Sequence, residues 1–372
     1  MNKIKLINLT IDNKGHYGLG ASACPFNEKY PLYLRITDIN DNSYVNDLST
    51  CIDPNVYSDY ENFILETNDI VFARTGNSTG RNYFYDGKFK NVVFAGFLIK
   101  FSLDPNKVVP QYVSYYCQSK KYKATIDSLS NGSTRKNLNA NQFGELEIPM
   151  YSSDMQQHIV NTIGTIDDKI ENNIRLINKI EEFLLLNFVK IEKCEGLVFS
   201  DIFNCFNGGT FKSSDYVEKS EYKLITIKNV DGNGFNTDNA TYIPKMNKYE
   251  KYKLKIGDIL LTMTGAYLGR SGIVDEENCY LNQRVLKISS VSKSFLYCFL
   301  KYNQNEIFNL GKGSAQPNLS LSDLNCFPVN YDINDINSFC ENDKYIDLII
   351  NLKIETRKLK TLKEQYLTKF FN

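Results

Sequence analysis

The hydrophobic residues of this chain follow two different patterns that alternate along the sequence. Residues 1–150 and 193–332 contain short apolar runs, rich in β-branched and aromatic residues and separated by Gly, Asn and Asp. Runs such as "LYLRITDI", "DIVFARTG", "YKLITIKNV" and "DILLTMTG" predict strands joined by turns. Segments such as "PQYVSYYCQSKKYKATI" and "SKSFLYCFLKYNQNEIFNL" predict helices between them. Each stretch is therefore expected to form a mixed α+β globule.

A heptad pattern follows each globule. From residue 154 to about 192, apolar side chains recur at alternating spacings of four and three, without a proline. This spacing predicts a coiled-coil helix in which Asn173 and Asn187 occupy seam positions and fix the register. Residues from about 335 to 372 predict a second such helix. The principal seam residues are expected to be Ile163, Ile166, Ile170, Asn173 and Ile177 on the first helix and Leu348, Leu352, Leu359 and Leu362 on the second.

Two long helices in one chain most simply pair with each other. We expect an antiparallel coiled coil that separates two α+β globules, with approximate twofold symmetry. The expected boundaries are 1–150 for the first globule, 151–192 for the first helix, 193–332 for the second globule and 333–372 for the second helix.

The two halves also share particular residues. Asp69, Thr75, Gly76, Gly80 and Arg81 recur as Asp258, Thr264, Gly265, Gly269 and Arg270, all at an offset of 189. In a second loop, Gly132, Ser133, Asn137 and Leu138 recur as Gly313, Ser314, Asn318 and Leu319, at an offset of 181. A period near half the chain length indicates the duplication of one module, because solenoid repeats are far shorter.

Composition places the chain among soluble globular proteins, with 42% hydrophobic and 23% charged residues. No apolar stretch approaches the roughly 18 residues of a membrane span, and no signal peptide is evident, so we expect a cytoplasmic protein. The 43 basic residues equal the 43 acidic ones. Binding to nucleic acid would therefore depend on local patches or on phosphate contacts made by a partner.

Candidate metal and disulfide chemistry is sparse. The nine cysteines are scattered without a C-x-x-C pair, which predicts reduced, buried thiols and no zinc site. Only two histidines exist, His16 and His158, so a histidine-based metal site or hydrolytic triad is not expected.

Several segments, in a fixed order, carry a family resemblance. They are "YGLGASACPFNEKYPLYLRITDI", "GDILLTMTG", and "GSTRKNLNANQFGELEIP" followed by "DMQQHIVNTIGTIDDKI". With a heptad helix after each globule, essentially the whole chain resembles the specificity subunit of type I restriction–modification enzymes.

This resemblance implies two target recognition domains, each of which reads one half of a split sequence in double-stranded DNA. It implies that the conserved helices space these domains and dock two modification (methyltransferase) subunits. Those subunits bind S-adenosylmethionine and methylate adenine N6, and restriction subunits complete a complex that cleaves DNA. The chain itself is then implied to be non-catalytic, with no cofactor and no metal of its own.

Candidate DNA contacts lie in and beside the two recurring loops. Arginine suits guanine, Asn or Gln suits adenine, and Lys suits phosphate. The candidates are Arg74, Asn77, Arg81, Arg135 and Lys136 in the first half and Tyr267, Arg270, Lys312 and Gln316 in the second.

Structural interpretations of these loops stand beside the functional one. The glycines of each first loop are four apart and are followed by Arg, so they do not match a phosphate-binding P-loop. They predict a strand-ending turn with positive φ, which Arg81 and Arg270 would anchor. The second loop would be a polar lead-in to the following helix.

The functional alternatives differ mainly in the partner. No [ND]-P-P-[YF], G-x-G-x-x-G or H-E-x-x-H motif is present, which favours a binding subunit over a self-contained enzyme. The same two readers would serve a type IIB-like or phage-exclusion methylation system. A coiled-coil scaffold whose globules bind protein, and not DNA, is the alternative from another class.

Overall fold

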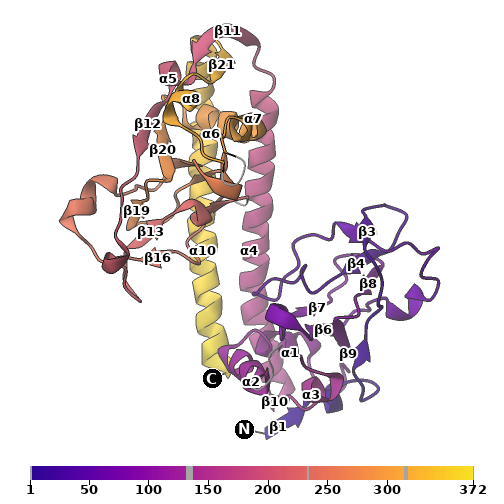
Figure 1. Cartoon of the computed structure of the whole chain (residues 1–372). Coiled ribbons are helices and arrows are strands. Elements are labelled where there is room, and N and C mark those ends of the chain that lie inside the picture. Colours follow the sequence, from indigo (N-terminus) through magenta and orange to yellow (C-terminus); the bar gives the residue numbers. More distant parts are fainter. Residues whose placement is uncertain (1, 131–136, 233, 314–316, 372) are drawn as a thin grey trace. The chain divides into compact units, whose positions relative to one another are not determined.

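A computed structural model describes residues 2–130, 137–232, 234–313 and 317–371 (Figure 1). The chain divides into two compact units. Unit 1 comprises Met1–Asp168 with Lys360–Asn372, and unit 2 comprises Lys169–Leu359. Each unit contains one globule and parts of two long helices, α4 (Ser153–Phe188) and α10 (Asp343–Phe371).

Three sheets form the globule of unit 1. A four-stranded sheet has the order β2-β9-β6-β7, with β2 at His16–Tyr17, β9 at Leu98–Ser102, β6 at Asp69–Ala73 and β7 at Asn82–Phe84. A second has the order β3-β5-β4-β8, with β3 at Cys24–Pro25, β5 at Thr50–Cys51, β4 at Leu32–Leu34 and β8 at Val92–Phe94. Strands β1 (Asn2–Lys5) and β10 (Glu147–Met150) form an antiparallel pair. The helices are α1 (Pro110–Tyr116), α2 (Lys120–Ser130) and α3 (Ala140–Gly144), with 3-10 turns η1 (Leu6–Leu9), η2 (Tyr60–Phe63) and η3 (Gly76–Ser78).

The globule of unit 2 repeats this plan. Its four-stranded sheet has the order β12-β20-β17-β18, with β12 at Asn204–Asn207, β20 at Val285–Ser289, β17 at Ile259–Thr262 and β18 at Ser271–Ile273. Its second sheet has the order β16-β13-β19, with β16 at Thr241–Tyr242, β13 at Lys223–Ile225 and β19 at Cys279–Leu281. Strands β11 (Lys193–Val198) and β21 (Pro328–Tyr331) pair, as do β14 (Val230–Asp231) and β15 (Gly234–Phe235).

The remaining elements of unit 2 are short helices. The α-helices are α5 (Phe199–Ile202), α6 (Lys293–Tyr302), α7 (Gln304–Asn309), α8 (Leu321–Asn325) and α9 (Ile333–Ser338). The 3-10 turns are η4 (Ser213–Asp215), η5 (Ile227–Asn229), η6 (Asn247–Tyr252), η7 (Gly265–Tyr267) and η8 (Phe339–Asn342). The structure thus confirms the α+β class and the duplication, since the four-stranded sheets of both units have equivalent strand orders and the second sheet of each contains one parallel pair, β4·β8 or β13·β19.

The continuous apolar runs of the sequence become strands that are buried on both faces. In β6, Ile70 and Phe72 join a core formed with α1, α2 and α3, whereas Val71 and Ala73 join a core formed with the second sheet. Successive strand residues point to opposite faces, so a strand between two layers needs apolar residues throughout. Strand β17 repeats this division, with Leu261 on the helix side and Leu260 on the sheet side.

The two long helices pair antiparallel within each unit. In unit 1, Lys363 of α10 forms an ion pair with Asp167 of α4 at 2.7 Å, and the Phe370 ring lies 6.2 Å from that of His158. In unit 2, the Asn173 side chain donates to Glu355 Oε2 at 2.8 Å. Farther along unit 2, the Phe183 ring lies 5.1 Å from that of Tyr345. In both units, contacts at higher residue numbers on α4 are made with lower residue numbers on α10. The pairing is therefore antiparallel, as expected from the heptads.

The expected seam of α4 lies on its buried face. Ile163 is fully buried, Ile166 and Ile177 are buried, and Ile170 is half-buried. Asn173 is also buried, and its side-chain nitrogen donates to Glu355 of α10.

The expected seam of α10 is wrong at two positions. Leu348 and Leu362 are 39% and 38% exposed, while Leu352 is buried and Leu359 is half-buried. Positions one residue later are more deeply buried, as Ile349 shows within the core of the second globule. Because α10 packs against a globule as well as against α4, its buried face is rotated from the one that pairing alone would give.

Side-chain hydrogen bonds shorten two strands relative to the sequence prediction. The expected strand at 32–39 ends at Leu34, where Asp38 accepts from the Arg35 N–H at 2.8 Å. The expected strand at 222–230 ends at Ile225, since Asn229 accepts from the Thr226 N–H at 3.0 Å. Such local bonds compete with the strand ladder.

The second long helix begins at Asp343 and not near residue 335. The Asp343 carboxylate accepts from the backbone N–H groups of Lys293 and Ser294, at 3.2 and 2.8 Å. These bonds hold the helix start against the beginning of α6, and the preceding residues form α9 and η8 instead.

The cysteines are all free, but the expectation that they are buried is wrong for three of the nine: Cys194, Cys326 and Cys340 are exposed. Cys194 lies in β11, Cys340 lies in η8 and Cys326 follows α8, at surface positions where spacing in the sequence gives no indication of burial. No helix in the described part of the chain combines the length and apolarity that crossing a bilayer requires.

The repeated glycines occupy turns that only glycine adopts readily. Gly76 and Gly265 have φ values of +69° and +71°, and Gly80 and Gly269 have +88° and +78°. The prediction of a strand-ending turn with positive φ is therefore confirmed. A Cβ on Gly269 would also lie 3.0 Å from the Gln304 carbonyl oxygen, so space as well as φ favours glycine there.

An ionic cluster joins α10 to the strands of unit 2. The Arg357 guanidinium forms ion pairs with Asp275 and Glu276, which follow β18, and it donates to Thr237 Oγ1 at 3.2 Å. Lys223 of β13 pairs with Glu276 at 2.7 Å. Burial raises the pKa of the Asp275 carboxyl, and the Arg357 charge opposes that shift. The cluster therefore fixes this edge of the globule on α10, because a buried carboxylate without its partner is costly.

Replacing Gly269 by Ala is expected to lower the free energy of unfolding by about 1–3 kcal/mol, since a non-glycine residue at positive φ is strained. Gly20→Ala is the matched control, because Gly20 lacks a positive φ and a Cβ there would meet nothing within 4 Å. Urea-induced unfolding measures both variants. Equal stability of the two would contradict the assignment of the turn.

Arg357→Met is expected to lower the free energy of unfolding by about 1–3 kcal/mol, less than for a fully buried pair because the Arg357 side chain is 33% exposed. Adding Asp275→Asn should recover part of this loss, since it removes the uncompensated charge. A double-mutant cycle in urea measures the coupling. Lys358→Met, at the exposed neighbouring position, is the control, and strictly additive losses would show that the pair is not coupled.

Candidate nucleic-acid interface

Three loops meet where β6 ends in unit 1. The Arg74 N–H donates to the Phe97 carbonyl oxygen at 3.0 Å, and the Leu138 N–H donates to the Arg74 carbonyl oxygen at 2.9 Å. Thr75 and Asn137 form an isolated antiparallel bridge. We call residues 74–80, 95–97 and 137–138 the unit 1 platform. The two recurring loops of the sequence, which are over 50 residues apart, are thus joined by backbone bonds.

The same arrangement occurs where β17 ends in unit 2. The Met263 N–H donates to the Arg284 carbonyl oxygen at 3.0 Å, and the Leu319 N–H donates to the Met263 carbonyl oxygen at 2.9 Å. Thr264 and Asn318 form the equivalent bridge. We call residues 263–269, 282–284 and 318–319 the unit 2 platform. The duplicated sequence therefore builds one backbone framework twice.

The two arginines that follow the turns have different roles. Arg81 Nε donates to Asp41 Oδ1 at 2.7 Å, and Arg81 also donates to the Ile39 carbonyl oxygen at 3.2 Å. These bonds hold the segment around residue 40, and Arg81 also donates to Ser78 Oγ of the turn at 3.4 Å. Arg270 lies over the Tyr267 ring, 4.9 Å from its centroid, and forms no ion pair within the described ranges. Its guanidinium therefore keeps donors for a ligand.

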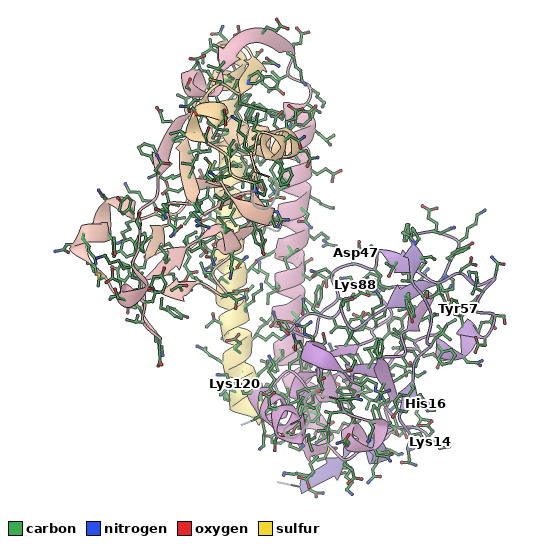
Figure 2. All side chains as sticks on the ribbon, viewed as in Figure 1. Lys14, His16, Asp47, Tyr57, Lys88 and Lys120 are labelled. Atoms are coloured by element: carbon green, nitrogen blue, oxygen red, sulfur yellow. The ribbon has the colours of Figure 1, made fainter. Side chains whose placement is uncertain are left out.

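Arg74, Tyr17 and Asn77 give the unit 1 platform a polar and aromatic surface. The Arg74 guanidinium lies 4.9 Å from the centroid of the Tyr17 ring. Its Nε is buried and finds no hydrogen-bond partner among the residues that the structure describes. Asn77 is exposed on η3. His16, which precedes Tyr17 on β2, lies at the surface of unit 1 (Figure 2), where its Nε2 is 2.5 Å from Asp12 Oδ2.

Lys312 borders the unit 2 platform. Its side chain is largely exposed and its Nζ lies 3.0 Å from Asp323 Oδ1. This hydrogen bond lowers the pKa of the Asp323 carboxyl. Lys312 and Asn318 also exchange two backbone hydrogen bonds of 3.0 Å, which close the loop between them. The other loop candidates, Arg135, Lys136 and Gln316, lie outside the described residues.

Two platform residues, Phe97 and Arg284, and the neighbouring Tyr17 of β2 were not expected from the sequence. Phe97 and Arg284 sit at equivalent corners, where the chain leaves β8 or β19 and enters β9 or β20. A further pair of glycines in the sequence, Gly18 and Gly208, could have indicated these two corners. A Cβ on Gly18 would lie 2.2 Å from the Ala95 carbonyl oxygen, and one on Gly208 would lie 2.2 Å from that of Asn282. Both corners therefore require a glycine directly after the facing strand, β2 or β12.

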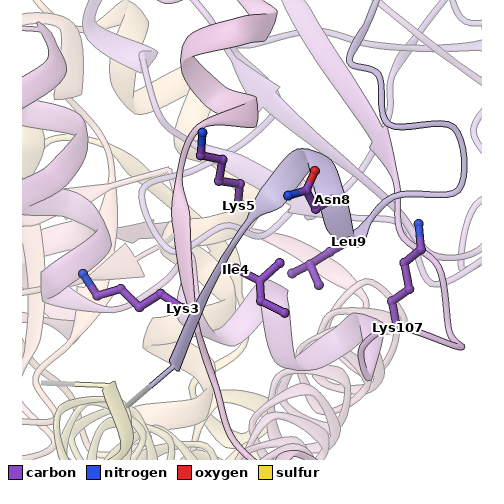
Figure 3. Close-up of a pocket in the computed structure, with 6 residues that line it drawn as sticks. All are labelled: Lys3, Ile4, Lys5, Asn8, Leu9 and Lys107. Carbon is purple, nitrogen blue, oxygen red and sulfur yellow. The ribbon is translucent and has the colours of Figure 1, made fainter.

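An open surface cavity of about 670 Å³ lies elsewhere on unit 1, beside β1 and η1 (Figure 3), and its lining residues are Lys3, Ile4, Lys5, Asn8, Leu9 and Lys107. Its lysines already have partners. Lys3 and Lys5 pair with glutamates at 2.6 Å each, and Lys107 donates to the Thr10 carbonyl oxygen at 2.7 Å. In the described ranges, no group of three or more His, Cys, Asp and Glu side chains could hold a metal ion. The platforms are thus the best candidates for the interface.

Comparison with known proteins gives a consistent family. Residues 22–182 and 196–332 match the model of the type I restriction modification DNA specificity domain. A putative type I specificity subunit of Mycoplasma genitalium is 26% identical over 242 residues, which are 59% of this chain and 58% of that protein. The specificity subunit of the type I restriction enzyme MjaIX of Methanocaldococcus jannaschii is 26% identical over 249 residues, 58% of this chain and 57% of that protein. The chain thus spans less than two thirds of the length of these relatives.

A solved structure has the same fold. The crystal structure of the S subunit of a type I restriction–modification system from M. genitalium aligns with a TM-score of 0.60 at 19% identity, covering 100% of this chain and 96% of that one. The family match extends over more than half of the residues and falls on both copies of the duplicated framework. From this match we conclude that the chain belongs to the family of type I restriction–modification specificity subunits.

Proposed function

We propose that this chain is the DNA sequence-recognition subunit of a type I restriction–modification complex. Residues 1–150 and 193–332 would be its two target recognition domains, and each would read one half of a bipartite site in duplex DNA. The observation that carries this proposal is the pair of platforms, which share a backbone framework and differ in their side chains. Asn77 of unit 1 is replaced by Ala266 in unit 2, and Phe97 is replaced by Arg284. A protein that reads two different half-sequences needs this combination.

Two kinds of contact are required of such a surface. Phosphate contacts fix the register of the protein on the duplex, and contacts to base edges select the sequence. Arg74 and Arg270 lie on or beside the platforms, stacked on tyrosine rings and without carboxylate partners among the described residues. Guanidinium groups held in this way suit phosphate oxygens or guanine. With 43 basic and 43 acidic residues overall, the chain would depend on a partner for further phosphate contacts.

A partner surface is supported by α4 within unit 2. Five large apolar side chains of this helix and its end are 41–53% exposed: Ile174, Leu176, Phe183, Leu186 and Val189. Exposed apolar side chains of this size offer area that a protein partner can cover. We assign this surface to a modification subunit and propose that the helices at 151–192 and 333–372 dock two such subunits in all.

Catalysis would then be carried out by the partner subunits. The modification subunits would bind S-adenosylmethionine and methylate adenine N6, and restriction subunits would add cleavage. This chain would contribute discrimination alone, at about 1–3 kcal/mol for each bidentate base contact. A type IIB-like or phage-exclusion methylation system could use the same readers, and the identity of the co-purified partner separates these systems.

The proposal is tested with the chain co-purified with its cognate modification subunits. A duplex library of random sequence is incubated with S-adenosylmethionine, and methylated adenines are sequenced. We expect one bipartite motif with a gap of fixed length, and native mass spectrometry should give two modification subunits per chain. The chain alone should neither methylate nor cleave.

The controls separate the chain from its partners. Modification subunits without this chain should methylate no specific motif, because recognition depends on the platforms. Assembly of the complex without specific methylation or binding of any duplex would favour a protein-binding scaffold and contradict the proposal.

A further inference from the structure

We propose that Phe97 and Arg284 contact base edges and determine one position in each half of the DNA target. This inference rests on the proposed function and deepens it, since it names the side chains that discriminate. It arises from the corners of the two platforms, which lie outside the loops that recur in the sequence.

The two corners are equivalent and rigid. The carbonyl oxygens of Phe97 and Arg284 each accept a 3.0 Å hydrogen bond from the first residue after β6 or β17. The preceding residue of each corner is held from the other side. The Gly96 N–H donates to the Leu19 carbonyl oxygen at 2.7 Å, and the Gln283 N–H donates to the Gly209 carbonyl oxygen at 2.9 Å. The backbone is therefore fixed from both sides. Side chains on such a frame are well placed for recognition, because little ordering is needed on binding.

The side chains themselves face solvent. Phe97 is 61% exposed, although Ala95 and Leu98 beside it are buried. A single exposed phenylalanine would mean little by itself. Here, however, the duplicated module retains the hydrogen bonds of the corner and changes the exposed residue from Phe to Arg. A position that is fixed in backbone and variable in exposed chemistry is what base reading requires.

The chemistry of each residue specifies what it would contact. Arginine forms two parallel hydrogen bonds with guanine O6 and N7, and an apolar ring contacts the thymine methyl group. Arg284 is exposed and has no ion pair within the described residues, so all its side-chain donors remain for a base. Its neighbour Gln283 accepts a 2.6 Å hydrogen bond from Thr210 Oγ1 through Oε1, which orients the amide. We therefore assign a guanine to Arg284 and a thymine to Phe97.

The test uses the co-purified complex and sequencing of methylated adenines, with the variants Phe97→Ala and Arg284→Ala. Arg284→Ala should reduce the preference for guanine at one position of one half-site about ten- to hundredfold. The other half-site should keep its sequence. Phe97→Ala should relax one position of that other half-site, by a smaller factor because an apolar contact is weaker. Phe97→Arg should create a new preference for guanine there.

Matched controls are exposed residues of similar chemistry in the same unit. Ile11→Ala matches Phe97, since Ile11 is 65% exposed, and Lys219→Ala matches Arg284 as an exposed cation. Neither control should change the motif. Thermal unfolding of all variants should match the wild type, because none of these side chains is buried.

The outcomes separate this inference from the proposed function. A bipartite wild-type motif that stays unchanged in both alanine variants overturns the inference and leaves the function intact. A uniform loss of affinity without a changed base preference also overturns it, since that result indicates phosphate contact. The absence of any bipartite motif with the wild-type complex overturns the proposed function itself.

Discussion

The backbone hydrogen bonds at the ends of β6 and β17 are the constraint on which the functional surface depends. In each unit, one residue after the strand bonds to two loops that are distant in sequence, and a turn with two positive-φ glycines completes the junction. Main-chain bonds of this kind are independent of the side chains around them. The module could therefore be duplicated and its exposed residues could change, while the framework stayed the same.

Buried apolar strands give this framework its stability. Strands β6 and β17 are buried on both faces, so a shift of either strand would disrupt two cores at once. Unit 2 adds the ionic cluster around Arg357, which ties one edge of the globule to α10. Ile166 and Asp167 of α4 recur as Ile346 and Asp347 of α10, at an offset of 180, and at this offset Ile177 of α4 corresponds to Arg357. The cluster thus shows that the two copies have diverged in how they are supported as well as in what they expose.

Much of this fold follows from the sequence because its strongest signals are local. The runs "DIVFA" and "ILLT" predict β6 and β17, and the heptads predict α4 and its antiparallel pairing with α10. The buried face of α10 could not be predicted, since both Leu348 and Ile349 are apolar and only the globule beside the helix favours the second. The same limit applies to the platforms. Phe97 and Arg284 are different residue types, so the sequence repeat does not pair them. Only the fold shows that they occupy equivalent corners.

The central claim is that one backbone framework supports two independent readers. It is tested most directly by a chimaera in which residues 1–150 also replace residues 193–332, assembled with the modification subunits. Sequencing of the methylated adenines should then give a motif in which the first half-sequence occurs twice. A motif that retains the second half-sequence, or an assembled complex that no longer methylates any specific site, would contradict this account.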